Sequence, residues 1–189
     1  MPKVSAAHLD ARRRGILAAA QRCVARQGVA ATTMRDICRA ANLSPGGVYR
    51  YFSGKNEILS ALAAQRQQQV EQFFRTLSNK SKSRPELLTA VQGLALALDG
   101  EPARDGLHLD LHLWSEAPVS PAVREALADG QRRILDNLVA SLPAESALDR
   151  EGMARALLAL LQGLALQKVL DPEVELGPLV GRLTGLLGE

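Results

Sequence analysis

The stretch TMRDICRAANLSPGGVYRYFSGK, residues 33–55, decides the fold of this chain. Its first part has the pattern of a short helix over residues 33–41, with apolar residues on one side. Thr33 is a favourable N-cap, and Asp36 stands three positions later, where it completes a capping box. These residues predict a helix that begins abruptly at Thr33.

The second part of the stretch predicts that this helix ends and another begins almost at once. Asn42 tolerates the left-handed backbone that ends a helix. Ser44 is a good N-cap, and Pro45 suits the first helical position because its missing N–H would be unpaired there. Two helices joined by a turn of about three or four residues form a helix-turn-helix. We expect this motif at 33–52, with a short third helix from Pro45 to Tyr51.

Helical patterns continue on both sides of the motif. An apolar stripe predicts a helix over 9–27 that stops at Gly28, and the break at Ser53-Gly54 precedes a long helix from Lys55 to about Leu77. The polar residues 78–84 predict a loop. Further helices are expected at 85–99, 104–116, 120–141, 149–169 and 174–187, with prolines in or next to the gaps.

Two observations bear on the fold class. Aromatic residues make up only 3% of the 189 residues, while Ala and Leu are abundant, which favours packed helices over a β-sandwich or barrel. Residues 107–113 alternate with period two, which is a strand signal. We interpret them as helical because the segment is short and surrounded by helical patterns. The expected fold is all-α.

Charge is divided unevenly along the chain. Residues 1–56 contain ten Lys and Arg against two acids, a net charge of +8, and residues 57–189 contain thirteen against eighteen, or −5. A basic end on an acidic body suggests a polyanionic partner for the first segment. A solvated basic face without such a partner is the alternative that charge alone leaves open.

The remaining bulk features favour a cytoplasmic protein. No run of about 18 apolar residues predicts a membrane span, and the N-terminus lacks the apolar core of a secretion signal. Cys23 and Cys38 stand at apolar helix positions, where reduced core thiols are the expected state. A disulfide or a metal site is the less favoured alternative, because two cysteines without nearby histidines are a poor zinc set.

The helix after the turn has the features of a helix that reads DNA in the major groove. Gly46 and Gly47 remove side-chain bulk where such a helix must approach the bases. Periodicity turns Val48 and Phe52 inward, and it leaves Tyr49, Arg50 and Tyr51 wholly or partly outside. Arg50 can reach a guanine edge or a phosphate, and the tyrosine hydroxyls, Lys55 and Thr33 suit phosphates. The expected DNA-binding residues are Thr33, Arg35, Ser44, Pro45, Gly46, Gly47, Tyr49, Arg50, Tyr51 and Lys55.

The segment around this motif closely resembles the N-terminal domain of TetR-type (tetracycline-repressor-like) transcriptional regulators. The resemblance covers about residues 10–65, roughly a third of the chain, and capping, turn, aromatic pair and lysine coincide in spacing. Two positions depart from the family pattern: Asn42 stands where Gly is frequent, and Gly47 where Thr, Ser or Ala is frequent. The second departure strips a side chain from an expected base-contact position and leaves the operator sequence open.

The resemblance implies an all-α fold of about nine helices, a homodimer, and a repressor released from DNA by a small-molecule effector. Residues 1–56 would form the DNA-binding domain, and 57–189 the effector-binding and dimerisation domain. The helices expected over 149–187 resemble the pair that forms a four-helix bundle across the dimer, and a two-fold dimer would read an inverted repeat in double-stranded DNA. A monomer core is the alternative for these helices. Whether the regulator represses or activates stays open.

The middle of the chain would hold the effector pocket, since small-molecule sites are mostly apolar with a few polar groups. No feature names the effector, and no cofactor is expected. A helix over 104–116 would place Asp105, His108, His112 and Glu116 on one face, which could form a divalent-metal site, although a polar surface or pocket lining is favoured. The candidate pocket residues are Phe73, Phe74, His108, His112, Trp114 and Glu116.

Two other classes of function are alternatives to a regulator. An enzyme is disfavoured because the sequence has no Gly-rich phosphate loop, nucleophile motif or convincing metal set. A protein that coats DNA without regard to sequence would need the charge but not the short, capped third helix. It would bind with a steep dependence on salt and little dependence on sequence.

Overall fold

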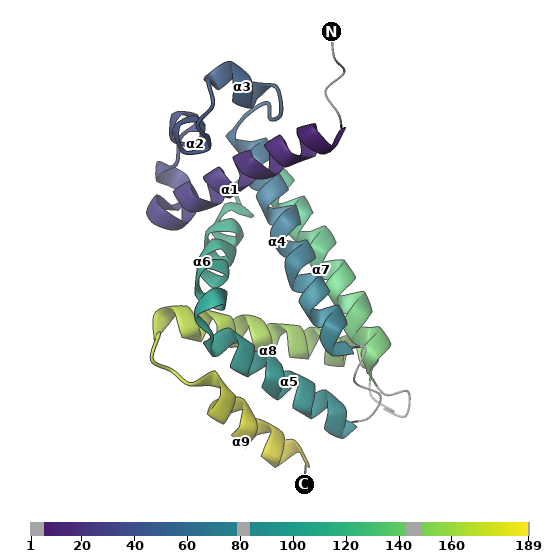
Figure 1. Ribbon diagram of the computed structural model, residues 1–189. Coiled ribbons are helices and arrows are strands. Elements are labelled where there is room, and N and C mark those ends of the chain that lie inside the picture. Colours follow the sequence, from purple (N-terminus) through teal and green to yellow (C-terminus); the bar gives the residue numbers. More distant parts are fainter. Residues whose placement is uncertain (1–5, 79–83, 143–148, 189) are drawn as a thin grey trace. The chain divides into compact units, whose positions relative to one another are not determined.

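The computed structural model describes residues 6–78, 84–142 and 149–188, and within these ranges every regular element is a helix (Figure 1). The prediction of an all-α fold is confirmed. Residues 107–113 lie within one of these helices. In chain order the described helices are α1 (Ala6–Ala31), α2 (Met34–Ala41), α3 (Pro45–Tyr49), α4 (Lys55–Ser78), α5 (Arg84–Asp99), α6 (Glu101–Glu116), α7 (Pro121–Ser141), α8 (Arg150–Leu170) and α9 (Leu176–Gly188).

The chain divides into two compact units, and the first combines residues up to 65 with residues 109–127. The inward faces of α1–α4 build most of its core, and the end of α6 and the start of α7 complete it. The scaffold that holds α2 and α3 therefore includes a segment from the middle of the chain. The most completely buried large side chains of this core are Ile16, Val24, Ile37, Val48, Phe52, Ile58, Leu59, Leu62, Leu113 and Val123.

Helix α1 is longer than predicted and bends near its end. Gly28 has φ 76° and ψ 169°, so it interrupts the helical conformation, but helical turns resume and continue to Ala31. Glycine fits here because a φ of this sign strains other residues. A Cβ at Gly28 would also lie 3.4 Å from Cε1 of His112, which comes from α6. The Thr32 hydroxyl donates to the Gly28 carbonyl oxygen at 2.7 Å and so satisfies an acceptor at the bend.

The second unit combines residues 66–108 with residues 128–189. Its described core is rich in leucine and comes from α4, α5, α7, α8 and α9. At one end of it the Asp99 carboxylate accepts hydrogen bonds from the backbone N–H groups of Leu176 and Gly177, at 3.1 and 3.0 Å. Lys168 lies 3.1 Å from the same carboxylate. Asp99 thus ties the end of α5 to the first turn of α9 and to α8.

Helix α8 is apolar on both sides, but only one side packs within its unit. Ala154, Leu158, Leu161, Leu164 and Ala165 are buried. On other faces Leu160 is 38% exposed and Leu170 75% exposed. Among the described helices, α8 alone is long and apolar enough to cross a membrane by length and composition. Its buried residues belong to the core of the second unit, as those of a core helix do.

Candidate nucleic-acid interface

Helix α2 begins with the capping box that the sequence predicts. The Thr33 Oγ1 accepts a hydrogen bond from the backbone N–H of Asp36 at 3.2 Å, and the Thr33 backbone N–H donates to the Asp36 carboxylate at 3.0 Å. The Thr33 hydroxyl also donates to that carboxylate at 2.6 Å. The hydroxyl and backbone N–H of Thr33 hold the pKa of Asp36 below its ordinary value. The reciprocal hydrogen bonds of Thr33 and Asp36 therefore fix the first turn of α2.

The turn between α2 and α3 follows from two residues. Asn42 has φ 53° and ψ 46°, the left-handed conformation, and its backbone N–H donates to the Arg39 carbonyl oxygen at 3.2 Å. The Ser44 Oγ accepts from the backbone N–H of Gly47 at 3.2 Å and caps α3. The joint is thus closed by local hydrogen bonds at the end of one helix and the start of the next.

Helix α3 turns an apolar side into the core and leaves its other side in solvent. Val48 and Phe52 are fully buried, at 0% and 1% exposed, while Tyr49 is 51% exposed. Arg50 is exposed, and Tyr51 is half-buried against the core. The helix itself ends at Tyr49, two residues earlier than predicted. The inward and outward positions agree with those expected from periodicity.

Arg13 has a structural role that sequence reasoning missed. Its guanidinium lies 4.2 Å from the centre of the Phe52 ring and donates to the Tyr51 carbonyl oxygen at 3.0 Å. It also lies 3.8 Å from the carboxylate of Glu57. The pKa of Glu57 is held low by the backbone N–H and hydroxyl of Ser53, with a smaller contribution from Arg13. Arg13 therefore secures the segment from α3 to α4 against α1.

Some of the basic side chains make contacts within the fold, and others have no such contacts and can bind a ligand. Arg35 and Arg50 are exposed, and neither guanidinium makes a hydrogen bond or ion pair with the described residues. Lys55 is half-buried, and its ammonium group donates to the Val29 carbonyl oxygen. Arg35 and Arg50 are thus the cations best placed for an external anion or base edge.

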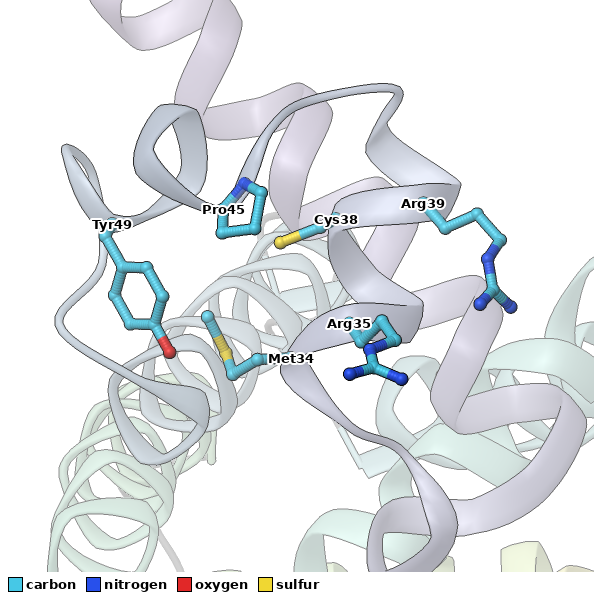
Figure 2. Close-up of a pocket in the computed structure, with 6 residues that line it drawn as sticks. All are labelled: Met34, Arg35, Cys38, Arg39, Pro45 and Tyr49. Atoms are coloured by element: carbon cyan, nitrogen blue, oxygen red, sulfur yellow. The ribbon is translucent and has the colours of Figure 1, made fainter.

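A pocket opens between α2 and α3 (Figure 2). Figure 2 shows the side chains of Met34, Cys38 and Tyr49 pointing toward the space between the two helices, and the guanidinium of Arg39 pointing away from it. Cys38 is itself 5% exposed, and both cysteines are free thiols. The pocket is lined by Met34, Arg35, Cys38, Arg39, Pro45 and Tyr49.

The candidate effector residues fall in both units. Phe74 is buried in the core of the second unit, and His108 is exposed there. In the first unit Trp114 is half-buried against the core, and His112 contacts the bend at Gly28. Glu116 is half-buried on the last turn of α6. The side chains of Phe73 and Asp105 lie outside the described ones, and the described residues contain no group of three or more His, Cys, Asp or Glu that could hold a metal ion.

Comparison with known proteins identifies the family. Residues 16–62 match the family model described as bacterial regulatory proteins of the tetR family. Residues 85–179, half of the chain, match the BetI-type transcriptional repressor C-terminal model. The chain belongs to the TetR family. It is therefore a transcriptional regulator with a helix-turn-helix, and not an enzyme.

Individual relatives of this TetR-family regulator align over most of its length. The HTH-type transcriptional regulator BetI of Rhizobium meliloti is 29% identical over 90% of this chain and 83% of the relative. The nicotine-responsive transcriptional repressor HdnoR of Paenarthrobacter nicotinovorans is 26% identical over 85% of each chain. Among solved structures, Salmonella enterica GusR has a TM-score of 0.75 with 26% identity, covering 100% of both chains.

The surface around α2 and α3 also contains residues that the sequence did not indicate. Met34, Cys38 and Arg39 line the pocket beside α3, although only Arg35 of α2 was expected to bind DNA. One local signal could have indicated the pocket. Met34 and Pro45 are apolar residues directly after the N-caps of two consecutive helices that a tight turn joins.

Proposed function

We propose that two copies of this TetR-family regulator bind an inverted repeat in double-stranded DNA and repress transcription until a small molecule releases them. The observation that carries the proposal is the division of α3: Val48 and Phe52 are buried, while Tyr49 and Arg50 face solvent beside a capped turn. A helix held by its inner side and open on its outer side can enter the major groove. Such binding would place the protein in the cytoplasm.

Some of the proposed DNA contacts position the protein on the duplex, and others select the base sequence. Arg50 and Arg35 can each donate two hydrogen bonds to the O6 and N7 of a guanine, and they are exposed and free among the described residues. Thr33, Ser44, Tyr51 and Lys55 lie at helix starts or beside the core, where their donors suit phosphates. Pro45, Gly46 and Gly47 would let the α3 backbone come close to the groove.

The dimer is proposed through α8. Its outward residues Met153, Ala156, Leu160, Gly163, Gln167 and Leu170 are exposed and alternate in steps of three and four, the spacing of a helix-pairing seam. The opposite side of α8 is buried in its own unit, so α8 cannot also be surrounded by lipid. A second copy of the chain would cover this seam through an isologous contact, and α9 would contribute beside it.

Sedimentation velocity tests the dimer directly. Leu160→Glu places a charge in the middle of the seam, and we expect a monomer that binds the inverted repeat at least tenfold more weakly. Val119→Glu is the matched control, because Val119 is a 74% exposed apolar residue outside α8. A Leu160→Glu protein that sediments as the wild type does would contradict the proposed seam.

The effector is proposed to bind within the first unit beside α6, where the candidate residues His112, Trp114 and Glu116 lie. The nicotine-responsive relative supports a small organic ligand. Trp114 is the single tryptophan of the chain, so its fluorescence reports on ligand binding near α6. A compound that changes this emission and also dissociates the DNA complex would support the proposal. A compound that changes the emission but leaves the DNA complex intact would show binding near α6 without release and would count against it as the effector.

Selection from random DNA tests the proposed function as a whole. Purified protein is incubated with random duplexes at about 150 mM salt, where non-specific electrostatic binding is weakened, and the retained DNA is sequenced. We expect an enriched inverted repeat whose half-sites are about one helical turn, roughly 10 base pairs, apart or a multiple of that. Retention without an enriched sequence would favour the sequence-blind DNA-coating protein instead.

A further inference from the structure

The pocket between α2 and α3 has an apolar interior. Met34, Cys38, Pro45 and the ring of Tyr49 form most of its lining (Figure 2). Its volume is about 360 Å³, so it can admit the edge of a base and not only a single atom. The pocket lies on the same surface as the outward residues of α3.

The two N-cap hydroxyls beside the pocket already take part in hydrogen bonds. The Thr33 hydroxyl donates to Asp36, and the Ser44 hydroxyl oxygen accepts from Gly47. Arg35 and Arg39 lie on the α2 side of the pocket, and Arg39 is 3.8 Å from the Asp36 carboxylate. An occupant therefore meets mostly carbon and sulfur atoms inside, and the unpaired side chain of Arg35 lies on the α2 side. This arrangement suits an apolar group that is attached to an anionic polymer.

DNA displays one such group in its major groove. The C5-methyl of thymine is the apolar feature among the donors and acceptors that the base pairs present there. Helix α3 has glycines at 46 and 47, so few of its side chains can contact bases. Because few side chains of α3 can contact bases, a pocket beside that helix could add to the discrimination between base sequences.

We propose that this pocket receives the C5-methyl group of one thymine in each half-site, with Met34 and Tyr49 against the methyl and Arg35 beside the adjoining base or phosphate. The inference rests on the proposed function, in which α2 and α3 face the major groove. It assigns to Met34, a residue of α2, a role in choosing the sequence that is bound.

The experiment removes the methyl without changing the protein. Each thymine of the selected operator is replaced in turn by deoxyuridine, which keeps every hydrogen-bonding group and lacks only the methyl. Binding to wild-type protein is measured by fluorescence anisotropy. We expect one symmetry-related thymine per half-site at which the replacement weakens binding by about fourfold per half-site, the effect of exposing one buried methyl group.

Variants assign that methyl to the pocket. Met34→Ala should abolish the difference between thymine and deoxyuridine at the sensitive position, because the contact surface is lost. Arg50→Ala, outside the pocket, should lower overall affinity and keep the difference. Met34→Leu preserves an apolar side chain of similar size, so it should keep most of the difference and shows that Met34→Ala acts through the lost surface.

The possible failures are distinct. Deoxyuridine that has no effect at any position would overturn the inference while leaving the selected operator, and with it the proposed function, intact. A sensitive thymine that is equally sensitive in Met34→Ala would place the methyl elsewhere and overturn the pocket assignment. A selection that yields no operator would overturn the proposed function first, and the inference with it.

Discussion

The ammonium group of Lys55 donates a hydrogen bond to the carbonyl oxygen of Val29, with Nζ and O 2.6 Å apart. The bond joins the first residue of α4 to the segment just after the bend in α1. Val29 is one of the buried core residues, and Lys55 is half-buried. Lys55, which the sequence predicts as a phosphate contact, therefore also secures the scaffold that holds α2 and α3.

Lys55→Met separates the two roles of Lys55. Loss of the hydrogen bond should lower the free energy of unfolding by about 1 kcal/mol, measured by urea denaturation. If the ammonium also meets a phosphate, the slope of log affinity against log salt should fall by about one unit on every duplex. A loss of stability with an unchanged salt slope would mean that Lys55 stabilises the fold and does not contact a phosphate.

Arg50→Ala should weaken operator binding by more than about 1 kcal/mol, over fivefold, because an exposed guanidinium that meets a base or phosphate is removed. The thermal unfolding midpoint should not change, since the guanidinium of Arg50 makes no hydrogen bond or ion pair with the described residues. Arg124→Ala, an exposed arginine on α7 in the same unit, is the control. Equal affinities of Arg50→Ala and wild type would remove Arg50 from the interface.

Gly46→Ala tests the close approach of α3. A Cβ at Gly46 would meet no other atom within 4 Å, so the fold accepts it, and alanine favours the helix by up to about 1 kcal/mol. We expect unchanged or higher thermal stability together with operator affinity at least tenfold lower. Gly93→Ala, equally unobstructed on α5, should leave operator affinity unchanged. Wild-type affinity of Gly46→Ala would show that α3 leaves room for a side chain.

Asp99 makes the stability of the second unit depend on pH. Burial alone would raise its pKa, but the backbone N–H groups of Gly177 and Leu176, together with Lys168, hold the pKa below its ordinary value. A carboxylate with a lowered folded-state pKa stabilises the protein above its unfolded pKa of about 3.9, and this stabilisation is lost as pH falls through the folded pKa. Asp99→Asn should therefore be less stable than wild type at neutral pH.

Thermal unfolding of the two proteins from neutral pH to about pH 3, below the ordinary pKa of aspartate, checks this expectation. The difference between wild type and Asp99→Asn should shrink as the pH falls. Lys168→Met should show a smaller loss at neutral pH, because the two backbone hydrogen bonds to Asp99 remain. A difference that is constant with pH would mean that the charge of Asp99 contributes nothing.

Local signals predicted the motif well because its geometry is closed by local hydrogen bonds. Thr33, Asn42 and Ser44 each act on residues within four positions of themselves, and each has the expected role. The alternating segment 107–113 is a helix despite its period of two. Leu107, Leu109 and Leu113 are all buried there, because a wide side of α6 is covered.

The contacts that hold the motif in place were beyond sequence reasoning because they join distant residues. Arg13 reaches Tyr51, and Lys55 reaches Val29, across 38 and 26 positions. Nothing in their neighbours distinguishes these cations from Arg35, which stays free. The compact units also divide the chain at 65, 108 and 127, within helices. The division of function at residue 56 stays a prediction.

The most direct test of the central claim, that α2 and α3 read a DNA sequence, is the ratio of two dissociation constants. One is measured for the selected inverted repeat and the other for a duplex of the same composition in scrambled order, both at about 150 mM salt. The proposed regulator should bind the repeat at least about a thousandfold more tightly. A ratio near one would contradict sequence reading by this surface, however tightly the protein binds both duplexes.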